Sequence, residues 1–407
     1  MTELTNNISK MLYRDKSRAY SILTLLDIDE TLGETFIHDY IQQVLLKNPI
    51  LKQTIVEKAN DAFFLVDMPL FDIKEHYSIK YIHKDKFNKH IYSILNTNDI
   101  QWYFMFCVDE ENNRSRMYFK IHHAYADGYK LINMLMTPFN HKDNDLTKQF
   151  KRTTNNVFET LYYYIIGTLS LVLMHIRFLF NLKWAREDAH GHVDALGHGH
   201  VQETDYLICK KLNLDHIKQF TKAHHITVND FLYSLMIKTD KLYRKREKTL
   251  LISSPINTSG LTQINNMAPI VNIINNTYDN KTLLNKIHAT FNNIKYSLFI
   301  PILNFTLNTI ANYVSIKVLL PVYNRFVSTI DYIYSNMIGP SLKDTTHKLL
   351  DFHFLTTANH KEIIYNIISC ENNINIICSF KKNGSIINNK NRFKKCFYKA
   401  YKMLLRS

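Results

Sequence analysis

The sequence predicts a mixed α/β protein built from two similar halves. Three observations support this: short period-2 alternations of apolar residues, apolar stripes at helical spacing between them, and recurrence of the strand-helix order in the second half. The first half covers residues 1–140 and the second covers residues 205–407. Residues 141–204 join a hydrophobic stretch to a His-rich linker. We therefore expect an N-terminal domain, a linker and a C-terminal domain.

The composition is that of a folded protein. With 407 residues, 46% hydrophobic and 13% aromatic, the chain is long enough for two substantial cores. Its five cysteines are scattered without a CxxC pair, which predicts neither a disulfide framework nor a zinc site. We expect a reducing, cytosol-facing location, and the polar N-terminus shows no secretory signal.

The net charge of +14 indicates an anionic partner. The 50 Lys and Arg residues are spread along the chain, and no helix-turn-helix, zinc-finger or RNA-recognition pattern accompanies them. We therefore expect no nucleic-acid partner. A phosphate-bearing cofactor or a membrane surface accounts for the charge more simply.

The first half begins with a strand at 19–27 and a helix that ends at Asn48-Pro49. One stripe of this helix is apolar and contains Leu32, Phe36, Ile37, Tyr40, Ile41, Val44 and Leu45. Further elements are expected at 50–57 (strand), 62–67 (strand), 85–96 (helix), 101–109 (strand) and 115–122 (strand).

The linker holds an uncharged apolar run from Leu161 to Met174, inside a hydrophobic segment that covers 157–184. Fourteen residues are fewer than the roughly 20 that a spanning helix needs. Three interpretations stay open: an interfacial or re-entrant membrane helix, a buried interdomain helix, and a true span. Basic residues and Trp184 flank the run, as at a lipid headgroup layer. Four histidines follow in a Gly-containing loop, which we interpret as a solvated linker rather than a metal site: His190, His192, His198 and His200.

The second half starts with a strand at 205–212, a helix at 213–223 and a helix from Thr227, where Thr-x-x-Asp predicts a capping box. The apolar stretch 298–330 is interpreted as core helices or as a second membrane-facing surface. Later strands and a basic C-terminal helix are expected at 249–256, 268–274, 332–337, 350–356, 363–369, 374–380 and 390–405.

One short motif carries the candidate chemistry. His122 and His123 end the strand at 115–122, Asp127-Gly128 stands in the turn that follows, and apolar residues at helical spacing begin after Gly128. Side chains alternate along a strand, so the two histidines are expected to point to opposite faces. A histidine can act as a general base, and a carboxylate nearby can orient it. The alternative is a buried polar pair that merely ends a strand.

This HHxxxDG motif resembles the active-site motif of the wax ester synthase/diacylglycerol acyltransferase (WS/DGAT) family, within the CoA-dependent acyltransferases. Four further segments are similar to elements of that family in the family's order, although Asp99-Ile100 replaces Pro-Leu in the second. They are Phe71–His76, Asn98–Trp102, Ile226–Asp230 and Ser335–Pro340. The resemblance spans about residue 20 to the C-terminus and is weakest over 140–205.

The resemblance implies two mixed-sheet sandwich domains of the CoA-dependent acyltransferase type, with a channel between them. It implies that His123 is the general base. Asp127 is expected to shape the loop or orient the histidine, Gly128 to permit a close approach, and His122 to be structural. We expect the substrate-binding residues to be Gly128, Asn229, Asp230 and Asn336, with a helix cap as the alternative role for Asn229-Asp230.

The implied reaction moves a fatty acyl group from acyl-CoA, a co-substrate, to a long-chain alcohol or diacylglycerol. The product is a wax ester or triacylglycerol. No permanently bound cofactor and no metal are expected. We expect a peripheral or monotopic protein on the cytoplasmic face of a membrane or lipid droplet, the endoplasmic reticulum being the membrane in a eukaryote. Two alternatives remain: a related acyltransferase or condensation enzyme with a small or carrier-bound acceptor, and a non-catalytic lipid-binding relative.

Overall fold

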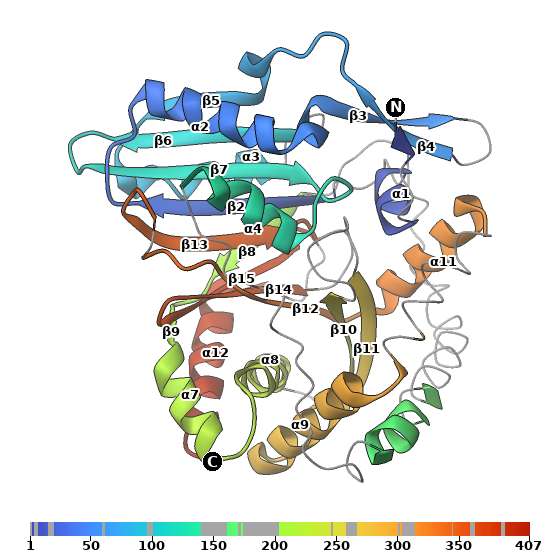
Figure 1. The fold of residues 1–407 in the computed structure, drawn as a ribbon. Coiled ribbons are helices and arrows are strands. Elements are labelled where there is room, and N and C mark those ends of the chain that lie inside the picture. The colour runs from blue at the N-terminus through green and yellow to red at the C-terminus, as the bar shows by residue number, and fades with distance from the viewer. Residues whose placement is uncertain are drawn as a thin grey trace.

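Two sheets stacked one above the other, each carrying helices, form the computed structural model (Figure 1). The blue and cyan strands of the first half make most of the upper sheet, and strands of the second half complete the upper sheet and make the lower one. The mixed α/β architecture expected from the sequence is confirmed. The structure describes residues 2–3, 7–14, 20–58, 62–95, 101–139, 161–169, 172–173, 203–245, 247–257, 267–299, 302, 314–343, 345–358, 363–383 and 387–407.

The upper sheet has five strands in the order β13-β2-β7-β6-β5. The pair β5–β6 is parallel and the other pairs are antiparallel. The bounds are β2 Ser21–Ile28, β5 Tyr77–Tyr81, β6 Trp102–Asp109, β7 Arg114–His122 and β13 Leu349–Thr356.

Helices cover both faces of the upper sheet. Helices α2 (Glu34–Lys47) and α4 (Gly128–Met136) pack on the face that carries Phe104 and Phe119, and α3 (Lys89–Leu95) packs on the other. The apolar stripe predicted for α2 is the face that it buries. A small three-stranded sheet and a short helix complete this half: β1 Thr2–Glu3, β3 Gln53–Lys58, β4 Ala62–Asp67 and α1 Asn7–Arg14.

The lower sheet follows the order β11-β10-β12-β14-β15-β8, with β9 also paired to β15. It is mixed, since β10–β12 and β12–β14 are parallel. The bounds are β8 Thr204–Ile208, β9 Leu212–Asn213, β10 Thr249–Asn257, β11 Met267–Asn275, β12 Tyr332–Ile338, β14 Ile363–Cys370 and β15 Asn373–Lys381.

Helices α8 and α12 pack against one face of the lower sheet. The predicted capping box starts α8: Asp230 N–H donates to Thr227 Oγ1, and Thr227 N–H donates to Asp230 Oδ2. The bounds are α7 Leu214–Ala223, α8 Val228–Arg244, α9 Asn280–Tyr296, α11 Ile316–Thr329 and α12 Lys390–Leu404. The strands and helices predicted above are thus present among the described residues, with ends shifted by a few residues. In the apolar stretch 298–330, α11 covers the last part, and residues 300–301 and 303–313 lie outside the described residues.

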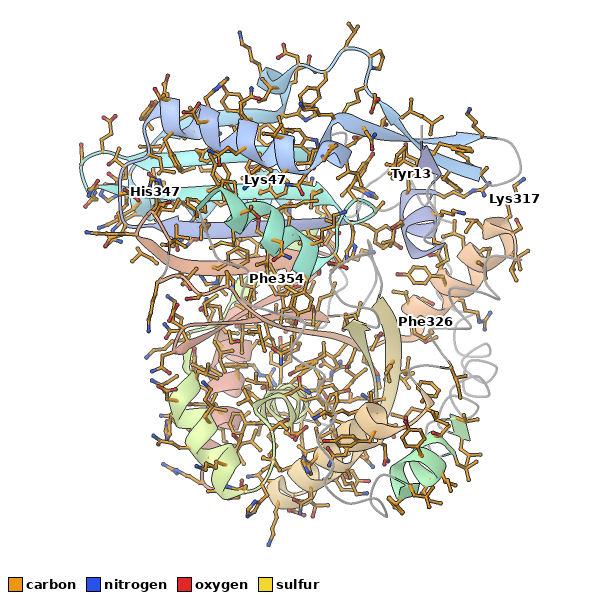
Figure 2. The ribbon with its side chains drawn as sticks, viewed as in Figure 1. Tyr13, Lys47, Lys317, Phe326, His347 and Phe354 are labelled. Carbon is orange, nitrogen blue, oxygen red and sulfur yellow. The ribbon has the colours of Figure 1, made fainter. Side chains whose placement is uncertain are left out.

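Strand β13 belongs to the second half of the chain but pairs with β2 of the first half, Phe352 opposite Leu26 and Phe354 opposite Thr24. Phe354 lies between the two sheets (Figure 2) and is buried in the core of the upper one. Sequence periodicity predicts this strand, but it cannot say which sheet the strand joins. The predicted boundary at residue 140 begins a stretch that lies largely outside the described residues.

Candidate active site

The two motif histidines lie where the ladder of β7 ends in a turn. His122 N–H donates to Gln101 O (2.7 Å), and His123 N–H donates to Tyr20 O (2.6 Å). The chain then turns, with Tyr125 N–H bonded to His122 O (3.0 Å). Strands on both sides therefore hold the backbone of both histidines, and the motif has the rigid support that a catalytic group requires.

The ring of His122 is held in one tautomer. Its Nδ1 accepts a hydrogen bond from Ala124 N–H (3.2 Å), so in the neutral ring the proton is on Nε2. Tyr13 and Tyr125 contact the ring edge-on, and Tyr13 comes from α1, beside the small sheet (Figure 2). Burial, followed by the nearby charges of His123 and Lys120, lowers the pKa of His122 to about 4. His122 is therefore neutral near pH 7.

Asp127 begins helix α4. Its carboxylate accepts a hydrogen bond from Lys130 N–H (2.9 Å), which makes it the N-cap, and the side chain is buried. An N-cap carboxylate also interacts favourably with the helix dipole. This geometry gives Asp127 a loop-organising position.

Gly128 touches the opposite half of the chain. A Cβ added at Gly128 would lie 2.2 Å from Met337 Sδ and 2.8 Å from Met337 Cε. Met337 is part of β12, in the Ser335–Pro340 segment whose resemblance was noted from the sequence. The two motifs therefore meet at the junction of the two halves, and the absence of a side chain at Gly128 lets the end of the Met337 side chain approach the backbone.

The other predicted substrate-binding residues form a polar cluster at the start of α8. Asn229 Oδ1 accepts hydrogen bonds from Asn336 Nδ2 (2.9 Å) and Tyr334 Oη (3.0 Å). Side chains alternate along β12, so Asn336 and Met337 point to opposite faces. The structure thus brings Asn229 and Asn336 together on the α8 face, whereas Gly128 lies on the other face of β12.

Asp230 is fully buried and combines two roles. Besides forming the capping box, its Oδ2 pairs with His288 Nδ1 of α9 (2.8 Å). The cap that was the alternative interpretation from the sequence is therefore present. His288 was not predicted, because nothing in the sequence links it to a residue 58 positions earlier.

Lys120 is a further group that the sequence did not indicate. It lies two residues before His122 on the same face of β7 and is 2% exposed. Burial lowers the pKa of its ammonium group to about 8. The only available signal was a lysine within an otherwise alternating strand, which usually marks a solvated face.

An Asp27–Asp351–His353 cluster has ligand atoms close enough together to suggest a metal site. Arg116 is bidentate on Asp27, however, and Lys211 Nζ (2.5 Å) and His353 Nε2 (2.9 Å) pair with Asp351 Oδ2. Burial acts to raise the pKa of Asp351, but His353 and Lys211 outweigh it and lower this pKa to about 2. Existing cations already neutralise both carboxylates, so the cluster fits a structural ion-pair network.

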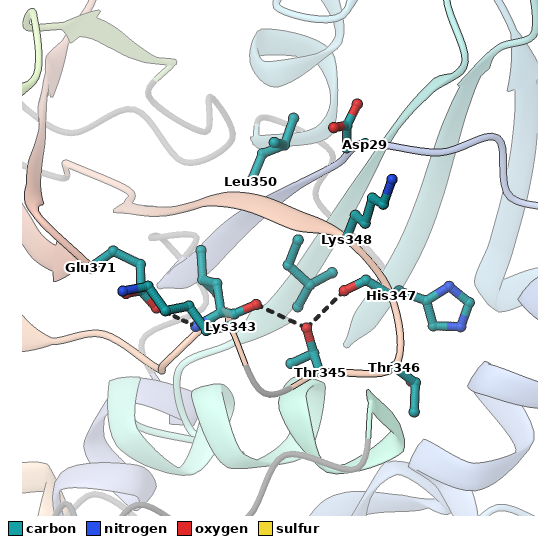
Figure 3. Close-up of a pocket in the computed structure, with 10 residues that line it drawn as sticks. Asp29, Lys343, Thr345, Thr346, His347, Lys348, Leu350 and Glu371 are labelled. Carbon is teal, nitrogen blue, oxygen red and sulfur yellow. Dashed lines mark hydrogen bonds and ion pairs between the residues drawn. The ribbon is translucent and has the colours of Figure 1, made fainter.

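A solvent-open hollow of about 390 Å³ lies along the β12–β13 connection (Figure 3). Lys343 pairs with Glu371 (3.2 Å), and Thr345 Oγ1 lies within hydrogen-bond distance of two carbonyl oxygens. No residue of the HHxxxDG motif lines this hollow. We do not assign the active site to it.

Between residues 141 and 202 the structure describes only 161–169 and 172–173, which are helical and include the π-helical turn Tyr163–Gly167. Of the described helices, none combines the length and the apolar character that a bilayer crossing requires. The His-rich loop and Asn98–Ile100 lie outside the described residues.

The two stacked halves with the HHxxxDG turn at their junction define the class: the fold is that of the CoA-dependent acyltransferases and condensation enzymes. The wax ester synthase/diacylglycerol acyltransferase from Marinobacter aquaeolei VT8 shares it with a TM-score of 0.60 and 12% identity, over 99% of this chain and 98% of that one. Trichothecene 15-O-acetyltransferase from Fusarium sporotrichioides gives a TM-score of 0.64 and 12% identity, over 99% and 94%. The epimerization domain from the third module of tyrocidine synthetase B gives a TM-score of 0.57 and 9% sequence identity, over 100% of this chain and 97% of that one.

A family model narrows this class. Residues 267–405 match the WS/DGAT C-terminal domain, which confirms the resemblance to that family expected from the sequence. No curated protein shows significant sequence similarity to the chain. The family match and the fold together support an acyltransferase function.

Proposed function

We propose that this protein is an O-acyltransferase that moves a fatty acyl group from acyl-CoA to the hydroxyl group of a long-chain alcohol or diacylglycerol. The observation that carries the proposal is the packing of Gly128 against Met337. This contact joins two motifs that resemble WS/DGAT elements, one from each half of the chain. The match of residues 267–405 to the WS/DGAT C-terminal domain supports the same substrate class.

His123 is the proposed general base. Its neutral ring takes the proton of the acceptor hydroxyl, the resulting alkoxide attacks the thioester carbonyl, and the imidazolium then protonates the leaving CoA thiolate. No covalent enzyme intermediate is needed. His122 suits this role poorly, since its Nδ1 is engaged by Ala124 N–H and its low pKa makes it a weak base.

The protein is proposed to act at the cytoplasmic side of a lipid surface, to which it binds peripherally. The support is a cluster of exposed apolar side chains on the described linker helix, including Ile165 (58% exposed) and Leu169 (53%). Thr168 Oγ1 bonds to Leu298 N–H (2.9 Å), which fixes this helix to the end of α9. Clustered apolar side chains at a protein surface are suited to the headgroup-acyl boundary of a membrane.

The deciding experiment supplies labelled palmitoyl-CoA to the purified protein, with hexadecanol and diacylglycerol as competing acceptors. We expect a labelled ester and a loss of roughly 100- to 10,000-fold in rate for His123→Ala, with unchanged thermal unfolding. His122→Ala should lose less. Equal losses in both variants with unaltered folding would reject His123 as the sole base.

A small-acceptor acyltransferase is the second candidate. The observation that favours it is that the fold likeness to the trichothecene acetyltransferase is as close as that to the wax ester synthase. Ester formed on water-soluble alcohols but not on hexadecanol or diacylglycerol would establish it. Flotation with liposomes, repeated on an Ile165→Ser/Leu169→Ser/Leu173→Ser variant, tests the lipid-surface proposal separately from turnover.

A further inference from the structure

We propose that the outer face of α12 binds the anionic headgroups of a phospholipid bilayer. This cationic face consists of Lys395, Lys399, Lys402 and, just after the helix, Arg406. The choice of a lipid surface rests on the proposed function, whereas the anion-binding face stands on its own geometry.

The four cations lie in one row on the surface. Their spacing of four, three and four residues places them on the same side of the helix, and all four are exposed. None has a hydrogen-bond or ion-pair partner among the residues that the structure describes. Helix α12 contains no acidic residue. Like charges at such spacings repel one another, so the row costs stability unless an anion neutralises it.

The N-terminal end of the same helix behaves differently. Lys390 Nζ pairs with Asp205 (2.6 Å), and Arg392 Nη2 donates to Tyr243 O (2.5 Å). The cations at the N-terminal end of α12 therefore make contacts that stabilise the fold. The cationic face has no comparable role within the described part of the chain.

The shape of the face suits an extended anion. Tyr398 and Met403 join the four cations around a shallow hollow of about 450 Å³. The outermost cations, Lys395 and Arg406, are eleven positions apart in the sequence, so at a helical rise of 1.5 Å per residue they are about 16 Å apart. A single phosphate group cannot contact all four, whereas a surface with many phosphates can. Apolar groups beside cations also suit the headgroup layer, where both are accommodated.

Helix α9 connects this face to the exposed apolar linker helix. At its start Asn280 Nδ2 donates to Met403 O (2.9 Å), and just beyond its end Leu298 N–H bonds to Thr168. The C-terminus, α9 and the green linker helix lie at the same lower end of the molecule (Figure 1). Helix α9 also lacks acidic residues and exposes Lys281 and Lys286. A bilayer that lies along this end would contact both the cationic face and the exposed apolar side chains of the linker helix. Nucleic acid would use only the cations, so we favour lipid as the ligand.

The test compares Lys399→Gln/Lys402→Gln with the native protein in binding to phosphatidylserine-containing vesicles. Each cation near an anionic bilayer contributes roughly fivefold in affinity, so the double variant should bind about 25-fold more weakly. Lys399→Arg/Lys402→Arg should bind as the native protein does. The matched control, Lys86→Gln/Lys89→Gln, removes the same charge from an exposed segment of the upper half and should change binding little.

Native-like binding of Lys399→Gln/Lys402→Gln to these vesicles would overturn the proposal. An equal loss in the Lys86→Gln/Lys89→Gln control would also overturn it, because net charge rather than this face would then be responsible. Weakened binding to duplex RNA with unchanged vesicle binding would assign the face to nucleic acid instead. Transfer to detergent-dispersed hexadecanol should be unaffected by the variant, so failure of this proposal is distinguishable from failure of the acyltransferase proposal.

Discussion

Met337 of β12 packs directly on the backbone of Gly128, leaving no room for a side chain there. We expect Gly128→Ala to lower the free energy of unfolding by at most about 1 kcal/mol, since overpacking forces only the flexible end of the Met337 side chain to move. The cost should shrink in a Met337→Ala background. Urea unfolding of the four proteins of this double-mutant cycle measures the coupling, and strictly additive effects would contradict the contact.

The N-cap role of Asp127 leads to a second prediction. Asp127→Ala removes the acceptor for Lys130 N–H and should cost about 1 kcal/mol of stability, whereas Asp127→Asn should retain the cap. Chemical denaturation of both variants provides the measurement, with acyl transfer assayed in parallel. Full stability together with complete inactivity in Asp127→Asn would point to a direct chemical role instead.

The low pKa of His122 predicts an acid-sensitive fold. The unfolded chain takes up a proton near pH 6.5, while the folded protein resists protonation until about pH 4. The unfolded state therefore binds more protons in this window, and stability must fall as the pH falls from 6.5 to 4, on the order of 2–3 kcal/mol. Urea unfolding across this range should show a shallower pH dependence for His122→Gln. Identical slopes would refute the assignment.

Asn229 accepts two hydrogen bonds from partners more than a hundred residues away in sequence. Asn229→Ala leaves Tyr334 Oη and Asn336 Nδ2 without this acceptor and should cost about 1–3 kcal/mol. Asn336→Ala in the same background should cost less than it does alone. Thermal unfolding checks this, and a neutral Asn229→Ala variant would show that the cluster contributes little to stability.

The sequence predicted elements whose pattern is local. The alternation of Met117, Phe119 and Ile121 predicted β7, and Thr227 with Asp230 predicted the start of α8. Partners distant in sequence were not predicted: the pairing of β13 with β2, the contact of Asp230 with His288, and the burial of Lys120. Periodicity records which face of an element is apolar, but it does not encode the neighbour that covers that face.

For the candidate active site, the sequence predicted the relative positions only of residues that lie close together in the chain, within one motif. His122, His123, Asp127 and Gly128 are consecutive or nearly so, and a strand-turn-helix connection sets their relative positions. The orientation of Asn336 away from Gly128 depends on the register of β12 in its sheet, which only the folded structure provides.

Because β13 of the second half pairs with β2 of the first half, the upper sheet cannot be completed until late in synthesis of the chain. Until residue 356 has left the ribosome, β2 has an unpaired edge, because its outer partner has not yet been made. Exposed strand edges readily pair with other chains. We expect the first half to depend on chaperones until β13 has been synthesised. A fragment that ends near residue 204 is expected to aggregate rather than fold independently.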